Sequence, residues 1–175
     1  IILGSGAGKV ATTGSKNVFI GDCTAMSGVV TGDNNVSIGT CAHKDLTSGA
    51  ANVILGQYAA GAFTTATDNI ILGCYAGKNS ISLCANILIG PETGACLCNG
   101  SHNIIMGQYA GRGSSTVSNN TASHNIALGQ ESLKVISSGT QNIALGTKAG
   151  CDLTSGCRNV FMGYYTGANA TGVAN

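Results

Sequence analysis

One five-residue motif recurs through the whole chain and limits the possible folds more than any other feature. It reads Asn, aliphatic, any residue, aliphatic, Gly, and we number the positions of the repeat from its asparagine. Nine copies begin at Asn17, Asn35, Asn52, Asn69, Asn86, Asn103, Asn125, Asn142 and Asn159. The opening Ile1-Ile2-Leu3-Gly4 is a further copy without its asparagine. The copies lie 17 residues apart, except for longer steps from Asn17 to Asn35 and from Asn103 to Asn125.

The residues between the motifs predict strands and turns. Each short aliphatic run is followed by glycine, by small residues and by a stretch rich in Thr, Ser, Gly and Asn, whereas a helical repeat needs apolar residues three and four apart. We therefore predict one all-β domain over residues 1–175. It is a parallel β-solenoid or β-roll of about ten repeats of 17 residues, one repeat per coil, in an oligomeric or fibrous protein. Coils stacked about 4.8 Å apart would form a rod roughly 45 to 50 Å long.

Identical positions of successive coils should lie above one another. The nine asparagines would then form a ladder whose side-chain amides hydrogen-bond along the axis. The glycine at position 5 marks a corner where a side chain would clash or where φ is positive. The five additional residues of the long repeat are expected in a loop within GSSTVSNNTAS, residues 113–123.

The strands are apolar at three consecutive positions, so both faces of the sheet carry apolar side chains. We expect positions 2 and 4 to face the core and position 3 to form an apolar stripe on the opposite face. This predicted assembly stripe consists of Ile2, Phe19, Ile54, Ile71, Leu88, Ile105 and Phe161. It would be covered either by another limb of the chain or by other copies, in a cyclic oligomer such as a trimer or in a filament. The chain ends are complementary in the phase of the repeat, which also favours end-to-end contact.

The composition argues against several classes of function. Charged residues make up 9% of the chain and the net charge is +1, so few side chains serve acid-base chemistry and no basic field attracts nucleic acid. No apolar run approaches the roughly 20 residues of a membrane span. We expect no catalytic site, no cofactor and no metal, and we place His43, His102 and His124 at the solvated surface.

Eight cysteines in a chain of 175 residues favour disulfides and an oxidising, extracellular compartment, and the alternative is a set of buried free thiols. The candidates are Cys23, Cys41, Cys74, Cys84, Cys96, Cys98, Cys151 and Cys157. Cys23 and Cys41 share position 7 in adjacent coils, where their Cα atoms should lie within disulfide range. Cys151 could pair with Cys157 across a turn, and Cys84 with Cys96 or Cys98. A zinc site is the alternative for Cys84, Cys96, Cys98 and His102, although their spacing fits no standard zinc pattern.

Two further sets of residues could serve recognition or modification. Tyr58, Tyr75, Tyr109 and Tyr165 share position 7, where they could pack between subunits or stack on sugars. Sequons begin at Asn35, which belongs to the ladder, and at the glycosylation candidates Asn99, Asn119 and Asn169.

Units such as NVILGQYAAG, NIILGCYAGK, NIIMGQYAGR and NIALGTKAG resemble the Asn-x-x-Ile-Gly-x-x-Ala-Gly repeats of phage and virus tail-fibre-like proteins and of bacterial surface fibre proteins. They are more distantly similar to the head repeats of trimeric autotransporter adhesins, whose repeat is shorter. The resemblance extends over essentially the whole chain and implies a trimeric or fibrous β-roll that acts as a shaft or surface-display element.

These observations lead to two functional hypotheses. The first is a non-enzymatic structural protein, in which disulfide-stabilised solenoid subunits self-assemble into an extracellular filament or fibre shaft at a cell or virion surface. The alternative is an adhesin or tail-fibre receptor-binding module that recognises surface glycans. Because Ile1 opens inside a motif, we also expect the chain to be a mature product or a part of something longer.

Overall fold

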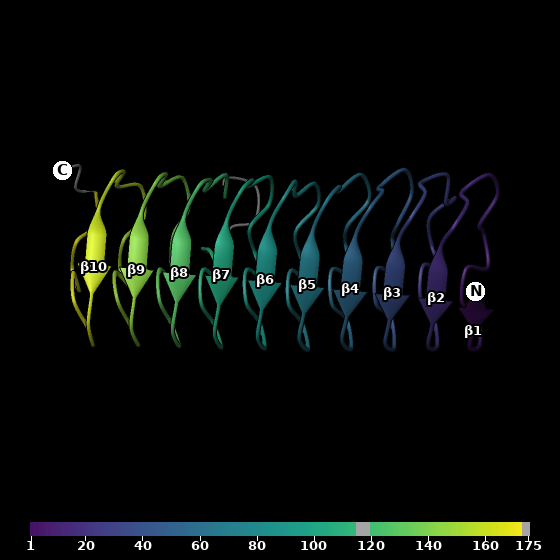
Figure 1. The fold of residues 1–175 in the computed structure, drawn as a ribbon, viewed down its shortest axis with the longest axis horizontal. Helices are drawn as coiled ribbons and strands as arrows, with labels where there is room; N and C mark the ends of the chain where they lie inside the picture. Colours follow the sequence, from purple (N-terminus) through teal and green to yellow (C-terminus); the bar gives the residue numbers. More distant parts are fainter. Residues whose placement is uncertain (115–119, 173–175) are drawn as a thin grey trace.

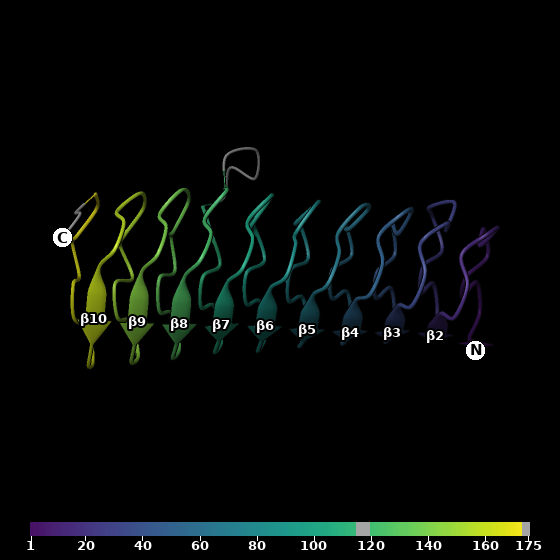
Figure 2. The ribbon, with the colours of Figure 1, turned by 45° about the horizontal axis from the view of Figure 1, so that its top comes forward.

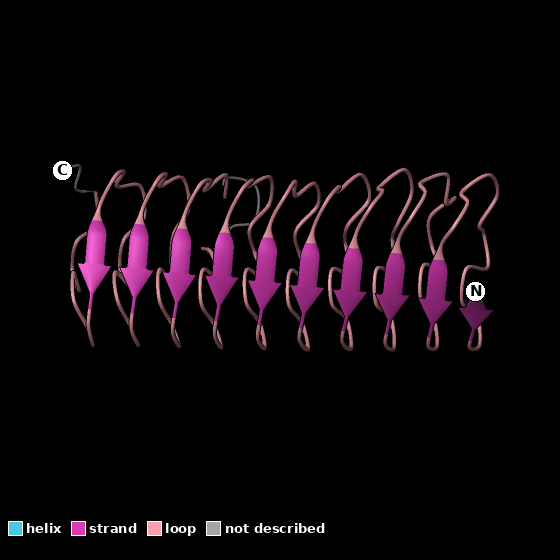
Figure 3. Ribbon diagram, viewed as in Figure 1, coloured by secondary structure: helices cyan, strands magenta, loops and turns pink. Residues whose placement is uncertain are grey.

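The computed structural model describes residues 1–114 and 120–172, and it confirms the β-solenoid. Ten parallel strands form one sheet in chain order, and the described residues contain no helix (Figures 1 and 3). The strands are β1 (Ile2–Leu3), β2 (Val18–Ile20), β3 (Val36–Ile38), β4 (Val53–Leu55), β5 (Ile70–Leu72), β6 (Ile87–Ile89), β7 (Ile104–Met106), β8 (Ile126–Leu128), β9 (Ile143–Leu145) and β10 (Val160–Met162).

Each strand from β2 to β9 pairs with the strands of the preceding and following repeats, with identical repeat positions side by side. Ile54 pairs with Ile71, and Ile71 pairs with Leu88. The long repeat keeps this register, because Ile105 of β7 pairs with Ala127 of β8. The sheet forms one side of the elongated molecule, and the turns close the coil on the other side (Figure 2). Strands β1 and β10 lie at opposite ends of the long axis (Figure 1).

The structure reverses the predicted assignment of the two faces of the sheet. Position 3 points into the coil: Phe19, Ile54, Ile71, Leu88 and Ile105 are at most 1% exposed. Of the predicted assembly stripe, Ile2 in the first coil remains exposed and Phe161 in the last is partly buried and packs against the core. The prediction that this stripe faces a partner is therefore wrong. The alternative, that another limb of the chain covers it, holds for the buried members, because the chain's own turns lie over them.

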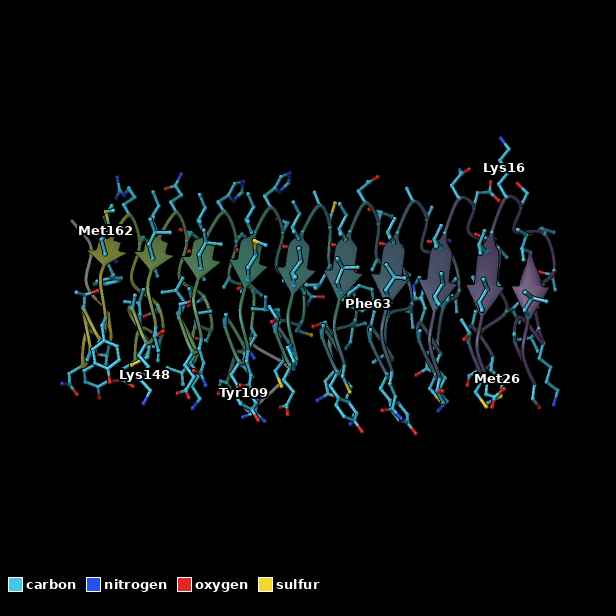
Figure 4. All side chains as sticks on the ribbon, turned by 60° about the horizontal axis from the view of Figure 1, so that its bottom comes forward. Lys16, Met26, Phe63, Tyr109, Lys148 and Met162 are labelled. Carbon is cyan, nitrogen blue, oxygen red and sulfur yellow. The ribbon has the colours of Figure 1, made fainter. Side chains whose placement is uncertain are left out.

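The turns supply the side chains that fill the core opposite position 3. Positions 9 and 12 contribute such residues as Leu97, Leu133 and Phe63, all fully buried. Figure 4 labels Phe63. In some coils the sizes at positions 3 and 9 are complementary. A Cβ on Gly111 would lie 2.5 Å from Ile105 Cδ1, so a larger residue at this position would force the Ile105 side chain to shift. Another coil instead combines the small Ala127 with the large Leu133.

The predicted asparagine ladder is present along the whole stack, from Asn17 to Asn159. Asn86 shows the pattern. Its backbone N–H and its Nδ2 both donate to Asn69 Oδ1 of the preceding coil, at 3.0 and 3.1 Å. Nδ2 also donates to the carbonyls of Cys84, two residues earlier in the chain, and Gly100, fourteen residues later, both at 3.0 Å. One buried side-chain amide thus joins three successive levels of the stack. Because its groups are paired, burial strengthens these hydrogen bonds.

The glycine at position 5 combines both features expected of it. Gly73 has φ of +139°, a region that side chains rarely adopt, and a Cβ there would lie 2.5 Å from the carbonyl oxygen of Gly90 in the next coil. The backbones of successive coils therefore approach each other at this corner too closely for any side chain.

Candidate interaction surfaces

The outer face of the sheet is apolar throughout its length. Positions 2 and 4 point outward, and we call their side chains the outer apolar face. It consists of Ile1, Leu3, Val18, Ile20, Val36, Ile38, Val53, Leu55, Ile70, Leu72, Ile87, Ile89, Ile104, Met106, Ile126, Leu128, Ile143, Leu145, Val160 and Met162. Ile70 is 42% exposed and Ile104 is 39% exposed, although each has sheet neighbours on both sides.

No polar residue interrupts this face, whereas the core column at position 3 includes Ser37. Ten strands about 4.8 Å apart make the outer apolar face roughly 45 Å long. A continuous apolar surface of this extent marks an interaction site in a protein. The sequence had pointed to such a surface, but on the wrong columns.

A second surface runs along the turn after each strand, where positions 7 and 10 lie. Figure 4 shows Met26, Tyr109 and Lys148 along this edge and Lys16 on the opposite edge. The rings of Tyr58 and Tyr75 stack here with centroids 5.4 Å apart and planes 6° from parallel. Lys78 Nζ lies 4.5 Å from the centroid of Tyr75. The neighbouring Cys41 raises the pKa of the Tyr58 hydroxyl. The electrostatic effect of Cys41 is the larger cause, and a side-chain hydrogen bond with it is the second.

The stack weakens the idea that this tyrosine pair is a platform for sugars. The faces that Tyr58 and Tyr75 turn toward each other are closed to a ligand, because each ring covers the other. Their common column instead favours packing within the chain.

Two cavities open beside the tyrosines. One, of about 230 Å³, is lined by Lys44, Asp45, Tyr58, Gly61, Ala62, Lys78 and Asn79. The other, of about 200 Å³, is lined by Tyr75, Lys78, Asn79, Glu92, Ala95, Cys96 and Arg112. Lys78 and Asn79 belong to both cavities, and Arg112 Nε lies 3.5 Å from Glu92 Oε2. Sequence reasoning missed this site, although the cations at position 10 of alternate repeats, from Lys9 to Arg112, were visible in the sequence.

All eight cysteines are free thiols in the structure. Cys23 and Cys41 occupy the same column in adjacent coils, as expected. Cys84 lies opposite Ser101, not opposite Cys96 or Cys98, so the coil register does not favour those two pairings. Cys74 lies 3.8 Å from Gln57 Oε1.

Cys151 and Cys157 have different surroundings and do not form a disulfide. Cys151 is buried, and burial raises the pKa of its thiol, with Asp152 adding to the shift. Cys157 accepts a hydrogen bond from Thr140 Oγ1 at 3.3 Å, which lowers the pKa of its thiol. The described residues contain no group of three His, Cys, Asp or Glu side chains that could hold a metal ion.

The histidines divide into one buried residue and one exposed pair. His43 is fully buried, which corrects the prediction that it is solvated. Its Nδ1 lies 3.1 Å from Ser37 Oγ, and Nε2 has no hydrogen-bond partner. Burial lowers the pKa of His43 to about 3. His102 and His124 are exposed, as predicted, and their rings stack with centroids 4.9 Å apart.

The sequons lie in different environments. Asn35 is buried in the ladder, as expected. Asn99 and Asn169 are exposed, and Asn119 lies outside the described residues. Among the residues that the structure describes, no helix is long and apolar enough to cross a membrane.

Comparisons with known proteins leave the family of this chain open. No protein-family model, no curated protein and no solved structure matches it. The resemblance to fibre repeats thus stays a prediction from the sequence motif, and the function has to be argued from the surfaces themselves.

Proposed function

We propose that this chain is a non-enzymatic structural protein whose copies associate through the outer apolar face, as subunits of an extracellular filament or fibre shaft. The observation that carries the proposal is the uninterrupted row of Val, Ile, Leu and Met at positions 2 and 4. Removing such side chains from water contributes about 25 cal/mol per Å² of buried apolar surface.

The favoured partner is a second copy of the same solenoid. The outer apolar face is corrugated at the strand spacing of about 4.8 Å, and a sheet with the same period can interdigitate with it along its whole length. The chain's own turns are engaged on the opposite side of the sheet, closing the core (Figure 2). A homo-oligomer or filament therefore fits this face better than a partner without the repeat.

Disulfides remain part of the proposal in one place. In an oxidising compartment, the shared column of Cys23 and Cys41 permits a bond between two adjacent coils. Such a bond would reinforce the stack without altering the outer apolar face.

The alternative function, an adhesin or tail-fibre receptor-binding module for surface glycans, is supported by a different observation. The two cavities on either side of Lys78 offer charged and amide groups to a polar ligand. Both functions are compatible in one molecule, because the cavities and the outer apolar face involve different residues.

Sedimentation velocity over a hundredfold range of protein concentration tests the structural proposal. We expect the natural chain to form oligomers and the double variant Ile70→Lys/Ile104→Lys to sediment as a monomer, because two charges would have to be buried in the contact. The matched control is Ile81→Lys, since Ile81 is 44% exposed but lies outside the strands. Monomers of the natural chain at every concentration, or oligomers of the double variant, would contradict the proposal.

A further inference from the structure

The cations of this chain are concentrated in one column of the repeat. Five of its eight lysine and arginine residues occupy position 10, namely Lys9, Lys44, Lys78, Arg112 and Lys134. In the middle of the stack they alternate with small residues, in the order Lys44, Gly61, Lys78, Ala95, Arg112. Backbone hydrogen bonds place the residues of this alternating series, Lys44 to Arg112, in successive coils. The bonds run from Asp45 N–H to Gly61 O, Ala62 N–H to Lys78 O, Asn79 N–H to Ala95 O and Cys96 N–H to Arg112 O.

The alternation explains the two cavities. The first cavity lies over Gly61, between Lys44 and Lys78. The second cavity lies over Ala95, between Lys78 and Arg112. Because neighbouring coils are about 4.8 Å apart, the three cations are spaced roughly 10 Å apart along the axis. We call this series of three cations and two cavities the basic edge.

Lys78 is the central group of the basic edge. Its Nζ lies 4.5 Å from the Tyr75 centroid and 5.8 Å from the Tyr58 centroid, so the ammonium lies beside the stacked pair and cation–π attraction favours this position. Lys78 is exposed and belongs to neither of the ion pairs among the described residues. A cation that lies between two cavities and outside both ion pairs is suited to bind an anionic group.

We propose that the basic edge binds a linear acidic polysaccharide, with a carboxylate at Lys78 and the adjoining sugar rings in the two cavities. Asp45 and Glu92 also line the cavities and can accept hydrogen bonds from sugar hydroxyls. The site goes beyond self-association and does not depend on it, because it uses none of the residues of the outer apolar face.

The same features disfavour nucleic acid. A nucleic-acid strand carries one charge per about 3.4 Å, far denser than cations roughly 10 Å apart. The two carboxylates would repel such a dense series of phosphates. Stacking of bases is also hindered, because Tyr58 and Tyr75 cover each other's inner faces.

The test measures binding of three polymers to the full chain at physiological salt by isothermal titration calorimetry. The probes are hyaluronate, which has a carboxylate on alternate sugars, the neutral polysaccharide dextran, and oligothymidylate. We expect hyaluronate to bind and the other two to bind at least tenfold more weakly. Equal binding of dextran, or tighter binding of oligothymidylate, would overturn the proposed class of ligand.

Two variants locate the site. Lys78→Gln should weaken hyaluronate binding about tenfold, since a hydrogen bond to a charged group is lost. Lys16→Gln is its matched control, because it removes the same charge from the opposite edge of the molecule and should change affinity less than twofold (Figure 4). Equal losses in both variants would show nonspecific attraction and overturn the site.

Gly61→Gln tests the cavity without changing charge. A Cβ on Gly61 meets its nearest atom at 3.5 Å, and this residue has no positive φ, so the fold accepts a side chain there. We expect hyaluronate affinity to fall at least fivefold while circular dichroism and sedimentation remain those of the natural chain. Unchanged affinity would overturn the role of the cavity, and because sedimentation is recorded separately, that result leaves self-association untouched.

Discussion

His43 shows what a single buried residue imposes on the coil. It takes the place of a small residue at position 9, with φ of 51°, and lies beside Ser37, the polar member of position 3. Its ring also meets Phe63 edge to face, with centroids 6.1 Å apart. The third coil thus accommodates a polar pair where its neighbours combine a large apolar residue, Phe19 or Ile54, with alanine.

Because the pKa of His43 is about 3 in the folded chain and about 6.5 when unfolded, acid should destabilise the fold. Between these two values the unfolded chain binds the additional proton, so the free energy of unfolding falls as the pH falls below about 6.5. The expected slope from this residue approaches about 1.4 kcal/mol per pH unit.

Thermal unfolding between pH 7.5 and 4 measures this effect in the natural chain and in His43→Ala. Alanine already occupies position 9 at Ala25 and Ala60 with φ of 47° and 49°. His43→Ala should be less stable at pH 7.5, because its core is less well filled, yet show a shallower loss of stability toward pH 4. His102→Ala is the exposed control and should keep the slope of the natural chain; identical slopes in all three proteins would refute the effect of His43.

At the scale of one coil, side-chain volumes at positions 3 and 9 are matched in two neighbouring coils. Ile105 faces Gly111 in one coil, and in the next Ala127 is combined with Leu133. Leu133 also reaches the following coil, because a Cβ on Gly150 would lie 2.9 Å from Leu133 Cδ2.

Exchanging one arrangement for the other should show strong coupling. Ala127→Ile alone should cost about 1 to 3 kcal/mol of stability by overpacking, and Leu133→Gly alone about 2 to 5 kcal/mol or more by leaving a cavity. The double variant reproduces the pattern of Ile105 and Gly111 and should recover most of the loss. Urea unfolding of the four proteins gives the coupling energy, and additive losses would show that the two positions do not share one space.

At the scale of the whole molecule, the solenoid is a one-dimensional stack. The strands pair in chain order, and the asparagine ladder repeats the same bonds from coil to coil. Stability in such an array is close to a sum of coils and their interfaces. The length of the stack should therefore be adjustable by whole repeats.

Deleting residues 69–85 removes one repeat and joins Asp68 to Asn86, which restores the order of columns. We expect this shorter chain to keep its β-sheet circular dichroism and a cooperative transition within a few degrees of the natural Tm. Deleting residues 75–82 breaks the register of every later coil relative to the ladder and should abolish the transition. Loss of structure in both deletions would contradict independent coils.

The sequence by itself determined the repeat, the strand in each coil and the asparagine ladder. Ten copies in phase can satisfy their backbone and amide groups only by stacking in register. It also contained the size matching of Ala127 with Leu133 and the pairing of Ser37 with His43, which could have identified position 3 as the inner column. When each position of the repeat is considered separately, these combinations of residues do not indicate which face of the sheet is buried.

Only the tertiary structure decided which side of the sheet lies inside. Three consecutive apolar residues carry no alternation, so burial favours both faces of the strand equally. The choice depends on the direction in which the chain turns at the position-5 glycine, with φ near +130°, and at the left-handed residues that follow. That turn brings positions 9 and 12 over position 3, leaves positions 2 and 4 outside, and places Lys78 between two cavities that its small neighbours leave open.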